Sequence, residues 1–357
     1  MAVYQNQIKK FIFKKDIFSK SSITLKKIDK SELKEELNFF KSFLSDKLQL
    51  YIPKNSSATN SKNFVIKCKN KSYLLKKESK HKENIIFKKK RLRELKKIEN
   101  KPFFIPLETS WDKLYSKNSY IWSLYKYFEG KHFSGKKKEL IFISKNFSKI
   151  NDQFQKLKIK KKSYKYFNEK DCKVVSKYEK NYRLWSQVLK IKNKKMKYIF
   201  YDYFLNEWNR IKHFKFDLNN LKKSYCHYDL HPHNIMINKN IIKIVDLNSL
   251  TFMPLEFSTA FSALKLCRQT IYFNKVKNFK NIGIYFLKNL NKKYCSKLNN
   301  DNFIYDYANA EIMRRICIIL NANLNKNKSL NYILPTLISN IIESKIIFKK
   351  MRFRNLI

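Results

Sequence analysis

Apolar residues recur along the chain with two different periods, and each period predicts a different kind of element. Helical spacing of leucine and phenylalanine predicts a helix over residues 31–48, with Ser31 as its N-cap. Apolar runs at Phe64–Lys67 and Tyr73–Lys76, separated by a Lys-Asn turn, predict a pair of strands. The polar stretch 53–63 between these elements predicts a loop.

Helical spacing returns over residues 82–100, and Pro102 closes that helix. The aromatic stretch 119–130 predicts a strand that stops at Gly130, a boundary signal in a chain with three glycines. A small strand-containing domain is therefore predicted to precede a larger, mostly helical one. The later helices are predicted at 139–157, 197–213, 256–273, 281–294, 306–324 and 330–350, the last interrupted at Pro335, with loops at 158–172, 189–197 and 322–328.

The helical part is interrupted by CHYDLHPHNIMINKNIIKIVDLNSL, residues 226–250. Two short apolar runs around an Asn-Lys-Asn turn predict a β-hairpin in this stretch. Because a hairpin returns its two ends to the same place, Asn234 before it and Asp246 after it are predicted neighbours. Asp229 lies in the loop just before Asn234. Two carboxylates and one amide therefore converge at one end of the hairpin.

This group of oxygens suits phosphoryl transfer. Mg²⁺ prefers hard oxygen ligands, of which the protein usually supplies one or two, and Asp246 and Asn234 could provide them. A carboxylate that is not on the metal, here Asp229, can orient an acceptor hydroxyl and accept its proton. Zinc held by the three histidines of the loop is a weaker alternative, because they lack the helical i, i+4 pairing typical of such sites.

Composition adds a strong positive charge, with 78 lysines and arginines against 28 aspartates and glutamates and a formal charge of +50. Such a charge is typical of proteins that bind nucleic acid or anionic membranes. Only nine of the basic residues are arginine, although base readout and bidentate phosphate contacts favour arginine. Genome base bias towards A/T-rich codons explains the abundant lysine, asparagine and isoleucine more simply, so we expect no nucleic-acid partner.

The six cysteines are scattered and form no C-x-x-C pair, which favours reduced thiols and a cytoplasmic location. The N-terminal stretch lacks the uninterrupted apolar core and cleavage site of a signal peptide. No apolar run approaches the length of a transmembrane helix, so no membrane span is expected.

The loop and hairpin resemble the catalytic and metal-binding segments of the aminoglycoside phosphotransferase and choline kinase superfamily. Its members typically read H-G-D-x-H-x-x-N, followed after a hairpin by an apolar-apolar-D segment. The matching residues here are His227, Asp229, His231, Asn234 and Asp246. The resemblance implies that the first three belong to the catalytic loop, with Asp229 as the base and His227 bracing the loop, and that the last two ligate Mg²⁺.

The same resemblance implies an α+β, two-lobed protein-kinase-like fold. Residues 1–126 would form a nucleotide-binding lobe, and residues 127–357 a helical lobe with the catalytic loop and acceptor site. Lys76 would bind the nucleotide phosphates and pair with a helix glutamate, either Glu83 or Glu94. Ser57 and Asn60 lie in a glycine-free loop at the place of the phosphate-covering loop, and Tyr125 lies on the strand that would contact the nucleobase.

The function expected from this resemblance is transfer of the γ-phosphoryl of ATP or GTP to a hydroxyl of a small acceptor. Amino alcohols, amino sugars, amino acids and sugars all remain open as acceptors. Four carboxylates of the helical lobe are available for a cationic acceptor: Asp202, Glu207, Asp306 and Glu311. Two alternatives also remain, a catalytically inactive kinase-like structural or coat-type protein and a basic nucleic-acid-binding protein.

Overall fold

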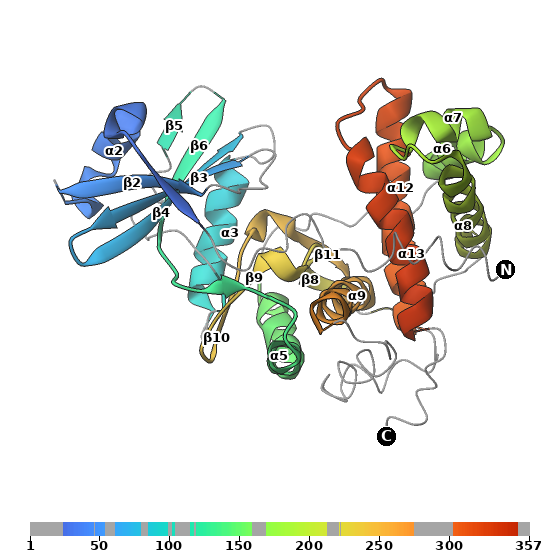
Figure 1. Cartoon of the computed structure of the whole chain (residues 1–357). Helices are drawn as coiled ribbons and strands as arrows, with labels where there is room; N and C mark the ends of the chain where they lie inside the picture. Colours follow the sequence, from blue (N-terminus) through green and yellow to red (C-terminus); the bar gives the residue numbers. More distant parts are fainter. Residues whose placement is uncertain are drawn as a thin grey trace.

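The computed structural model describes residues 24–45, 47–53, 61–79, 85–98, 102–103, 115–117, 119–158, 169–212, 221, 223–274 and 303–348. Within these residues an antiparallel sheet forms the N-terminal part and a mostly helical part follows it, as Figure 1 shows. The predicted α+β class is therefore confirmed. The lobe boundary at residues 126 and 127 stays a prediction, although the last strand of the sheet in sequence ends at Lys126.

The N-terminal sheet has six strands in the order β1-β2-β3-β4-β6-β5. Helix α3, Ile85–Lys97, follows the central strand β4 in the chain. Alternate residues of the strands, among them Leu50, Ile66 and Leu75, are fully buried in a core of their own. The strands are β1 Leu25–Ile28, β2 Leu48–Pro53, β3 Ser61–Cys68, β4 Lys71–Ser79, β5 Tyr115–Lys117 and β6 Tyr120–Lys126.

The helix predicted over residues 31–48 is wrong in extent. A 3₁₀ turn η1, Lys30–Leu33, and a short helix α2, Lys34–Phe39, occupy its first half, and β2 begins at Leu48. Asp29 caps the first turn by accepting a hydrogen bond from the Ser31 backbone N–H at 2.7 Å, so Ser31 is not the cap. Pairing with β1 and β3 on both sides fixes β2 as a strand, and a local helical period cannot reveal such pairing.

The predicted hairpin is confirmed as β9, Ile235–Asn238, and β10, Ile241–Ile244. A second antiparallel pair joins β8, Lys223–His227, to β11, Leu250–Pro254. The two pairs hold the intervening loops, which lie before β9 and after β10. The Val245 backbone N–H donates to the Asn234 carbonyl at 3.0 Å, so the two ends of the hairpin do meet.

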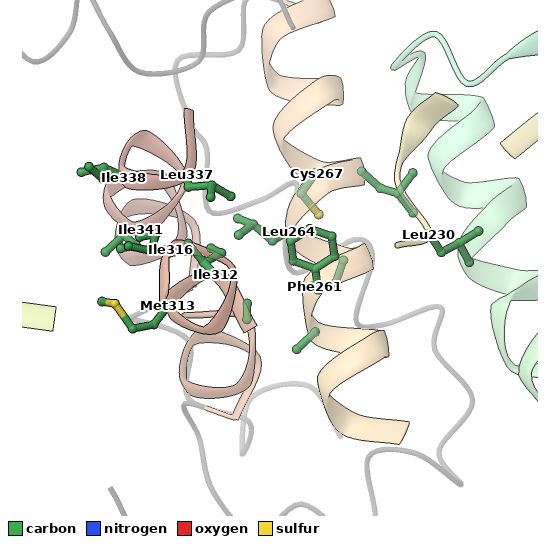
Figure 2. Close-up of a cluster of buried hydrophobic side chains, with 14 of the residues drawn as sticks. Leu230, Phe261, Leu264, Cys267, Ile312, Met313, Ile316, Leu337, Ile338 and Ile341 are labelled. Atoms are coloured by element: carbon green, nitrogen blue, oxygen red, sulfur yellow. The ribbon is translucent and has the colours of Figure 1, made fainter. Parts of the chain in front are cut away.

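Helices make up most of the C-terminal part, and buried side chains of α9, α12 and α13 interlock there. Figure 2 shows Phe261 and Leu264 of α9 in one cluster with Ile316 of α12 and Ile341 of α13. Leu230, from the loop after β8, belongs to the same core and is 1% exposed, so the core anchors this loop. The helices are α5 Lys137–Gln155, α6 Glu169–Glu179, α7 Tyr182–Val188, α8 Lys194–Lys212, α9 Leu255–Asn274, α12 Phe303–Leu324 and α13 Leu334–Phe348.

Several predicted boundaries shift in this part. Pro335 does not interrupt a helix but stands in the first turn of α13, where its missing N–H costs no hydrogen bond. The segments 189–197 and 322–328 are partly helical, and the predicted helix 281–294 lies outside the described residues. None of the helices in the described ranges is both long and apolar enough to cross a membrane.

Candidate active site

The loop between β8 and β9 is closed by its own polar groups. The Asn234 side-chain amide donates to the Asp229 carbonyl at 2.8 Å, and the His231 backbone N–H donates to the same oxygen at 2.9 Å. The Asn234 backbone N–H donates in turn to the His231 carbonyl at 2.9 Å. These bonds between residues close in sequence hold Asp229 and Asn234 at fixed positions relative to each other.

His227 is 1% exposed and braces the two sides of the loop. Its Nε2 lies 3.0 Å from the Val245 carbonyl, and its own carbonyl accepts from the Ser258 hydroxyl at 3.0 Å. Burial lowers the pKa of His227 despite the nearby Asp246 and Asp229 carboxylates, so its ring is neutral at pH 7. A neutral imidazole donates Nε2–H to the carbonyl, which fits the bracing role expected for His227.

Asp229 lies against an arginine of α12 that the sequence did not indicate. Arg315 Nη1 donates to Asp229 Oδ1 at 2.9 Å, while Nη2 donates to the Tyr228 carbonyl at 3.1 Å. His231 Nε2 is 3.6 Å from the other carboxylate oxygen. Burial opposes the ionised form, but Arg315 and His231 outweigh it and hold the pKa of Asp229 at about 2. Asp229 is therefore a carboxylate at neutral pH.

Asp246 and Asn234 offer oxygen donors at the open end of the hairpin. Asp246 adopts the left-handed region with φ 58° and ψ 51°, and its side chain is 41% exposed. Its Oδ2 accepts from the Ser249 hydroxyl at 3.2 Å. Because the Asn234 amide nitrogen is committed to Asp229, its carbonyl oxygen is the group left to meet a cation. Carboxylate and amide oxygens are the donors that Mg²⁺ prefers, so the residues fit this ion.

No group of three or more His, Cys, Asp or Glu side chains within the described residues is arranged to hold a metal ion. The three histidines of the loop thus do not form a zinc site together with neighbouring acids. A Mg²⁺ ion held by Asn234 and Asp246 would complete its coordination with phosphate and water oxygens, which is the usual arrangement for this ion.

Lys76 lies on β4 and reaches the same place from the N-terminal sheet. Its Nζ is 2.8 Å from Glu78 Oε1 and 4.0 Å from Asp246 Oδ1. Burial alone would lower the pKa of Lys76, but the Glu78 and Asp246 carboxylates raise it above its ordinary value. Tyr125, paired with Leu74 on the adjacent strand, is 7% exposed, and burial raises the pKa of its hydroxyl. The structure thus brings Lys76 and Asp246 together across the two parts of the chain.

Of the two predicted partners of Lys76, Glu94 is wrong. Glu94 binds Lys97, one turn further along α3, at 2.7 Å, and the carboxylate beside Lys76 belongs to Glu78 on the same strand. Residues two apart on a strand share a face, which explains the pairing of Lys76 with Glu78. The other candidate for this pairing and two predicted nucleotide-binding residues lie outside the described residues: Glu83, Ser57 and Asn60.

The carboxylates proposed for a cationic acceptor are mostly occupied by arginine. Glu207 and Asp306 both bind Arg210, and Glu311 binds Arg314 and Arg315. Glu207 and Glu311 are also deeply buried, at 6% and 0% exposure. A cationic acceptor would have to displace an arginine from these groups, so they do not favour one.

Five polar residues of this region were not predicted from the sequence, because each acts through a contact between different elements. Arginine is scarce in this chain, so the positions of Arg91 and Arg315 are the one feature of the sequence that could have indicated two of these residues. The missed residues are Glu78, Lys88, Arg91, Asn248 and Arg315.

Comparison with solved structures identifies the fold. A spectinomycin phosphotransferase in complex with ADP and spectinomycin superposes with a TM-score of 0.55 at 14% identity, over 88% of this chain and 96% of its own. An amicoumacin kinase in complex with AMP-PNP and Ca²⁺ superposes with a TM-score of 0.56 at 11% identity, over 92% and 99%. An aminoglycoside phosphotransferase from Alicyclobacillus acidocaldarius gives 0.50 at 12% identity, over 83% and 91%.

These matches show that the chain has the protein-kinase-like fold of the aminoglycoside phosphotransferases over most of its length. The expected fold is therefore confirmed. No protein-family model matches the sequence, and no curated protein matches it significantly.

Proposed function

We propose that the protein is a small-molecule kinase that transfers the γ-phosphoryl of ATP or GTP to a hydroxyl of a small acceptor. The observation that carries this proposal is the convergence of Lys76, Asp246, Asn234 and Asp229 at the junction of sheet and helical part. A phosphate-binding cation, two oxygen donors for Mg²⁺ and a separate carboxylate are the parts that phosphoryl transfer requires.

The nucleotide phosphates would lie between Lys76 and the hairpin end. Lys76 is ionised and held by Glu78, so it meets the phosphates as a fixed positive charge rather than a mobile one. Asn234 and Asp246 would hold Mg²⁺, which neutralises charge on the β- and γ-phosphates when it is bound. The Asp246 side chain is 41% exposed and so accessible to a ligand, whereas its backbone is fixed by the bond from the Ser249 N–H.

Asp229 would receive the acceptor. Its Oδ1 is occupied by Arg315, so Oδ2, on the side of His231, is the oxygen that accepts a hydrogen bond from the acceptor hydroxyl. A carboxylate with so low a pKa is a weak base. In a loose phosphoryl-transfer transition state, however, the hydroxyl proton needs to leave only late, and orientation contributes more than proton abstraction.

The acceptor class proposed here is an amino alcohol, amino sugar or sugar, because all carry a hydroxyl that can meet Asp229. A catalytically inactive structural protein with the same fold is the main alternative. The Asp229, Asn234 and Asp246 set supports the enzyme, since an inactive protein has no need to keep two carboxylates beside the Asn234 amide, which is held by the Asp229 backbone carbonyl.

The test is a screen of hydroxyl-bearing acceptors with labelled ATP and Mg²⁺, repeated with Asp229→Asn. Asparagine keeps the shape of the side chain but lacks the negative charge that orients the acceptor hydroxyl and cannot take its proton, so we expect phosphoryl transfer to fall by about 10²–10⁴-fold. Nucleotide affinity should change little, because Asp229 is not a metal ligand. A wild-type chain that binds Mg·ATP but phosphorylates no acceptor, with the variant indistinguishable from it, would support the inactive protein instead.

A further inference from the structure

Glu78 lies between two lysines from different elements. Its Oε1 is 2.8 Å from Lys76 Nζ, and its Oε2 is 2.5 Å from Lys88 Nζ on α3. Glu78 is 8% exposed and Lys88 only 3%. Burial would raise the pKa of Glu78, but the two lysines lower it well below its usual range, so the group is a carboxylate bridging two ammonium ions.

Asn248, two residues after Asp246, joins the same group from the helical part. Its amide nitrogen donates to Glu78 Oε1 at 2.8 Å, and its carbonyl oxygen accepts from Arg91 Nη2 at 2.8 Å. Arg91 is 3% exposed and lies one turn after Lys88 on α3. Figure 1 shows α3 between the six-stranded sheet and the segment that carries β9 to β11.

The carboxylate beside Lys76 lies on the strand and its second cation on the helix, the reverse of the expected pairing with a helix glutamate. A strand lysine was predicted to pair with a helix glutamate, whereas here the strand carries both Lys76 and Glu78 and the helix contributes a lysine. The acidic residue of α3, Glu94, binds Lys97 instead. With Asp246 included, three cations face two carboxylates, so a surplus of positive charge remains at the position where phosphates would bind.

We propose that Lys88 and Arg91 are positioning residues of the nucleotide site, and that α3 acts through them. Lys88 holds Glu78, which in turn fixes Lys76. Arg91 holds Asn248, which fixes the segment of Asp246. The inference rests on the proposed function in one respect, that the anion bound by Lys76 and Asp246 is a nucleotide.

The physical consequence is that one helix sets the distance between the phosphate-binding lysine and the metal-binding aspartate. Glu78, Lys88 and Arg91 are buried and Asn248 is half-buried, so solvent screens both contacts less than it would a surface ion pair. Removing a partner that orients a metal ligand typically costs about 10–100-fold in affinity or activity. Lys88 supports the phosphate-binding Lys76 through Glu78 in a comparable way, and we expect a loss of about that size when its contact is broken.

The experiment moves the carboxylate from the strand to the helix. Lys88→Glu places a second carboxylate against Glu78, Glu78→Gln removes the first, and the double variant leaves one carboxylate, now on α3, for Lys76. The exposed Lys90 of the same helix gives the matched control Lys90→Glu, which makes the same charge change. Affinity for Mg·ADP is measured by calorimetry on the full chain, and thermal unfolding is recorded without nucleotide.

We expect Lys88→Glu to weaken Mg·ADP binding by about 10–100-fold and to lower the unfolding midpoint. The double variant should recover most of both losses, and Lys90→Glu should show neither. Should Lys88→Glu fail to fold, Lys88→Gln tests the loss of the ion pair alone, because it breaks the pair without adding a charge, and the double variant of Lys88→Glu with Glu78→Gln still tests recovery.

Two results would overturn the inference: Mg·ADP affinity unchanged in a folded Lys88→Glu variant, or a double variant that binds Mg·ADP no better than the single one. Failure of the wild-type chain to bind Mg·ADP would instead count against the proposed function. The unfolding measurements would still decide whether α3 is anchored through Lys88 and Glu78.

Discussion

Arg315 reaches Asp229 from a position 86 residues further along the chain. It also binds Glu311 Oε1 through Nε at 2.8 Å, and its guanidinium lies 4.1 Å from the centre of the Phe261 ring. A planar, permanently charged group with donors at both ends suits this place better than lysine. Arg315 thus fixes both the orientation and the ionisation of the carboxylate proposed to receive the acceptor.

Removing this charge should change the pH dependence of activity. In the wild-type chain the pKa of Asp229 is about 2, so protonation of this group does not limit activity above about pH 3. In Arg315→Met the effect of burial is no longer offset by Arg315, so the pKa rises and the acid limb of kcat/KM moves to higher pH. Arg315→Lys, which keeps the charge, should shift it less.

The low pKa of Asp229 in the wild-type chain also affects the stability of the fold. A carboxyl whose folded-state pKa lies below its unfolded value of about 3.9 stabilises the fold above that pH. This contribution disappears as pH falls towards 2. Arg314→Met is the matched control, because Arg314 binds Glu311 as Arg315 does, whereas Arg315 is the residue that donates to Asp229. An identical acid limb in Arg315→Met and Arg314→Met would contradict the assignment.

The metal assignment is tested at two neighbouring residues. Asp246→Ala should abolish the Mg²⁺ dependence of nucleotide binding while the fold survives, because the side chain is 41% exposed and contributes little packing. Asn234→Ala should act in the same direction but more weakly, since a neutral amide offers a cation less than a carboxylate does. Titration of Mg²⁺ at fixed ADP measures both effects. Unchanged Mg·ADP affinity in folded Asp246→Ala would refute the ligand assignment.

Single residues also show what the sequence could not reveal. Asp229, Asn234 and Asp246 could be predicted, because a loop and hairpin bring them together within a short stretch. Arg91 and Asn248 are 157 residues apart, and Asn248 and Glu78 are 170 apart. No periodicity in the sequence encodes such a contact. In a chain so poor in arginine, the buried Arg91, Arg268 and the half-buried Arg315 all bind polar side chains.

At the scale of elements, α9 supports the loop between β8 and β9 through Ser258. The Ser258 hydroxyl donates to the His227 carbonyl at 3.0 Å, and both residues are buried. Ser258→Ala should lower the free energy of unfolding by about 1–3 kcal/mol, because it leaves a buried carbonyl without its partner. It should also lower kcat, since the loop of Asp229 loses a support.

The control for this prediction lies one turn further along the same helix. Ser262 is fully buried, and within the described residues its hydroxyl has no hydrogen-bond partner. Ser262→Ala should therefore be close to neutral in chemical denaturation and in activity. Equal losses in Ser258→Ala and Ser262→Ala would mean that packing of the helix, not the hydrogen bond to His227, accounts for the effect.

Strands joined by a short turn, such as β3–β4 and β9–β10, were predicted well, and strands paired across a longer stretch of chain, such as β1 and β2, were not. The hairpin β9–β10 has its turn and both strands within one short stretch, and α9 is buried along nearly its whole length. In contrast, β1 and β2 are a strand pair at the edge of the sheet, with few buried residues of their own. Strand β2 is also held by its pairing with β3, and the hydrophobic period of a single sequence does not reveal such pairing.

For the whole molecule, the charge of +50 raises a question about specificity. A polyanion such as a nucleotide is attracted to so basic a chain wherever lysines lie, so binding alone does not identify a site. Binding at the proposed site requires Mg²⁺ and Asp246, whereas non-specific attraction to surface lysines requires neither. That difference can be measured as ligand-induced stability.

A ligand that binds only the folded chain stabilises it by about 2.7 kcal/mol at a free concentration about 100 times its Kd. We therefore expect Mg·ATP to raise the unfolding midpoint of the wild-type chain, and the Mg²⁺-dependent part of this rise to vanish in Asp246→Ala. Inorganic tripolyphosphate without Mg²⁺ measures the contribution of charge alone, and added salt should weaken it because exposed charges are screened. The effect of Mg·ATP should persist in that salt, since Lys76 is largely buried and its partners are close. If tripolyphosphate without Mg²⁺ stabilised wild type and Asp246→Ala as much as Mg·ATP did, binding would reflect the general charge of the chain, and the nucleotide site would have no support.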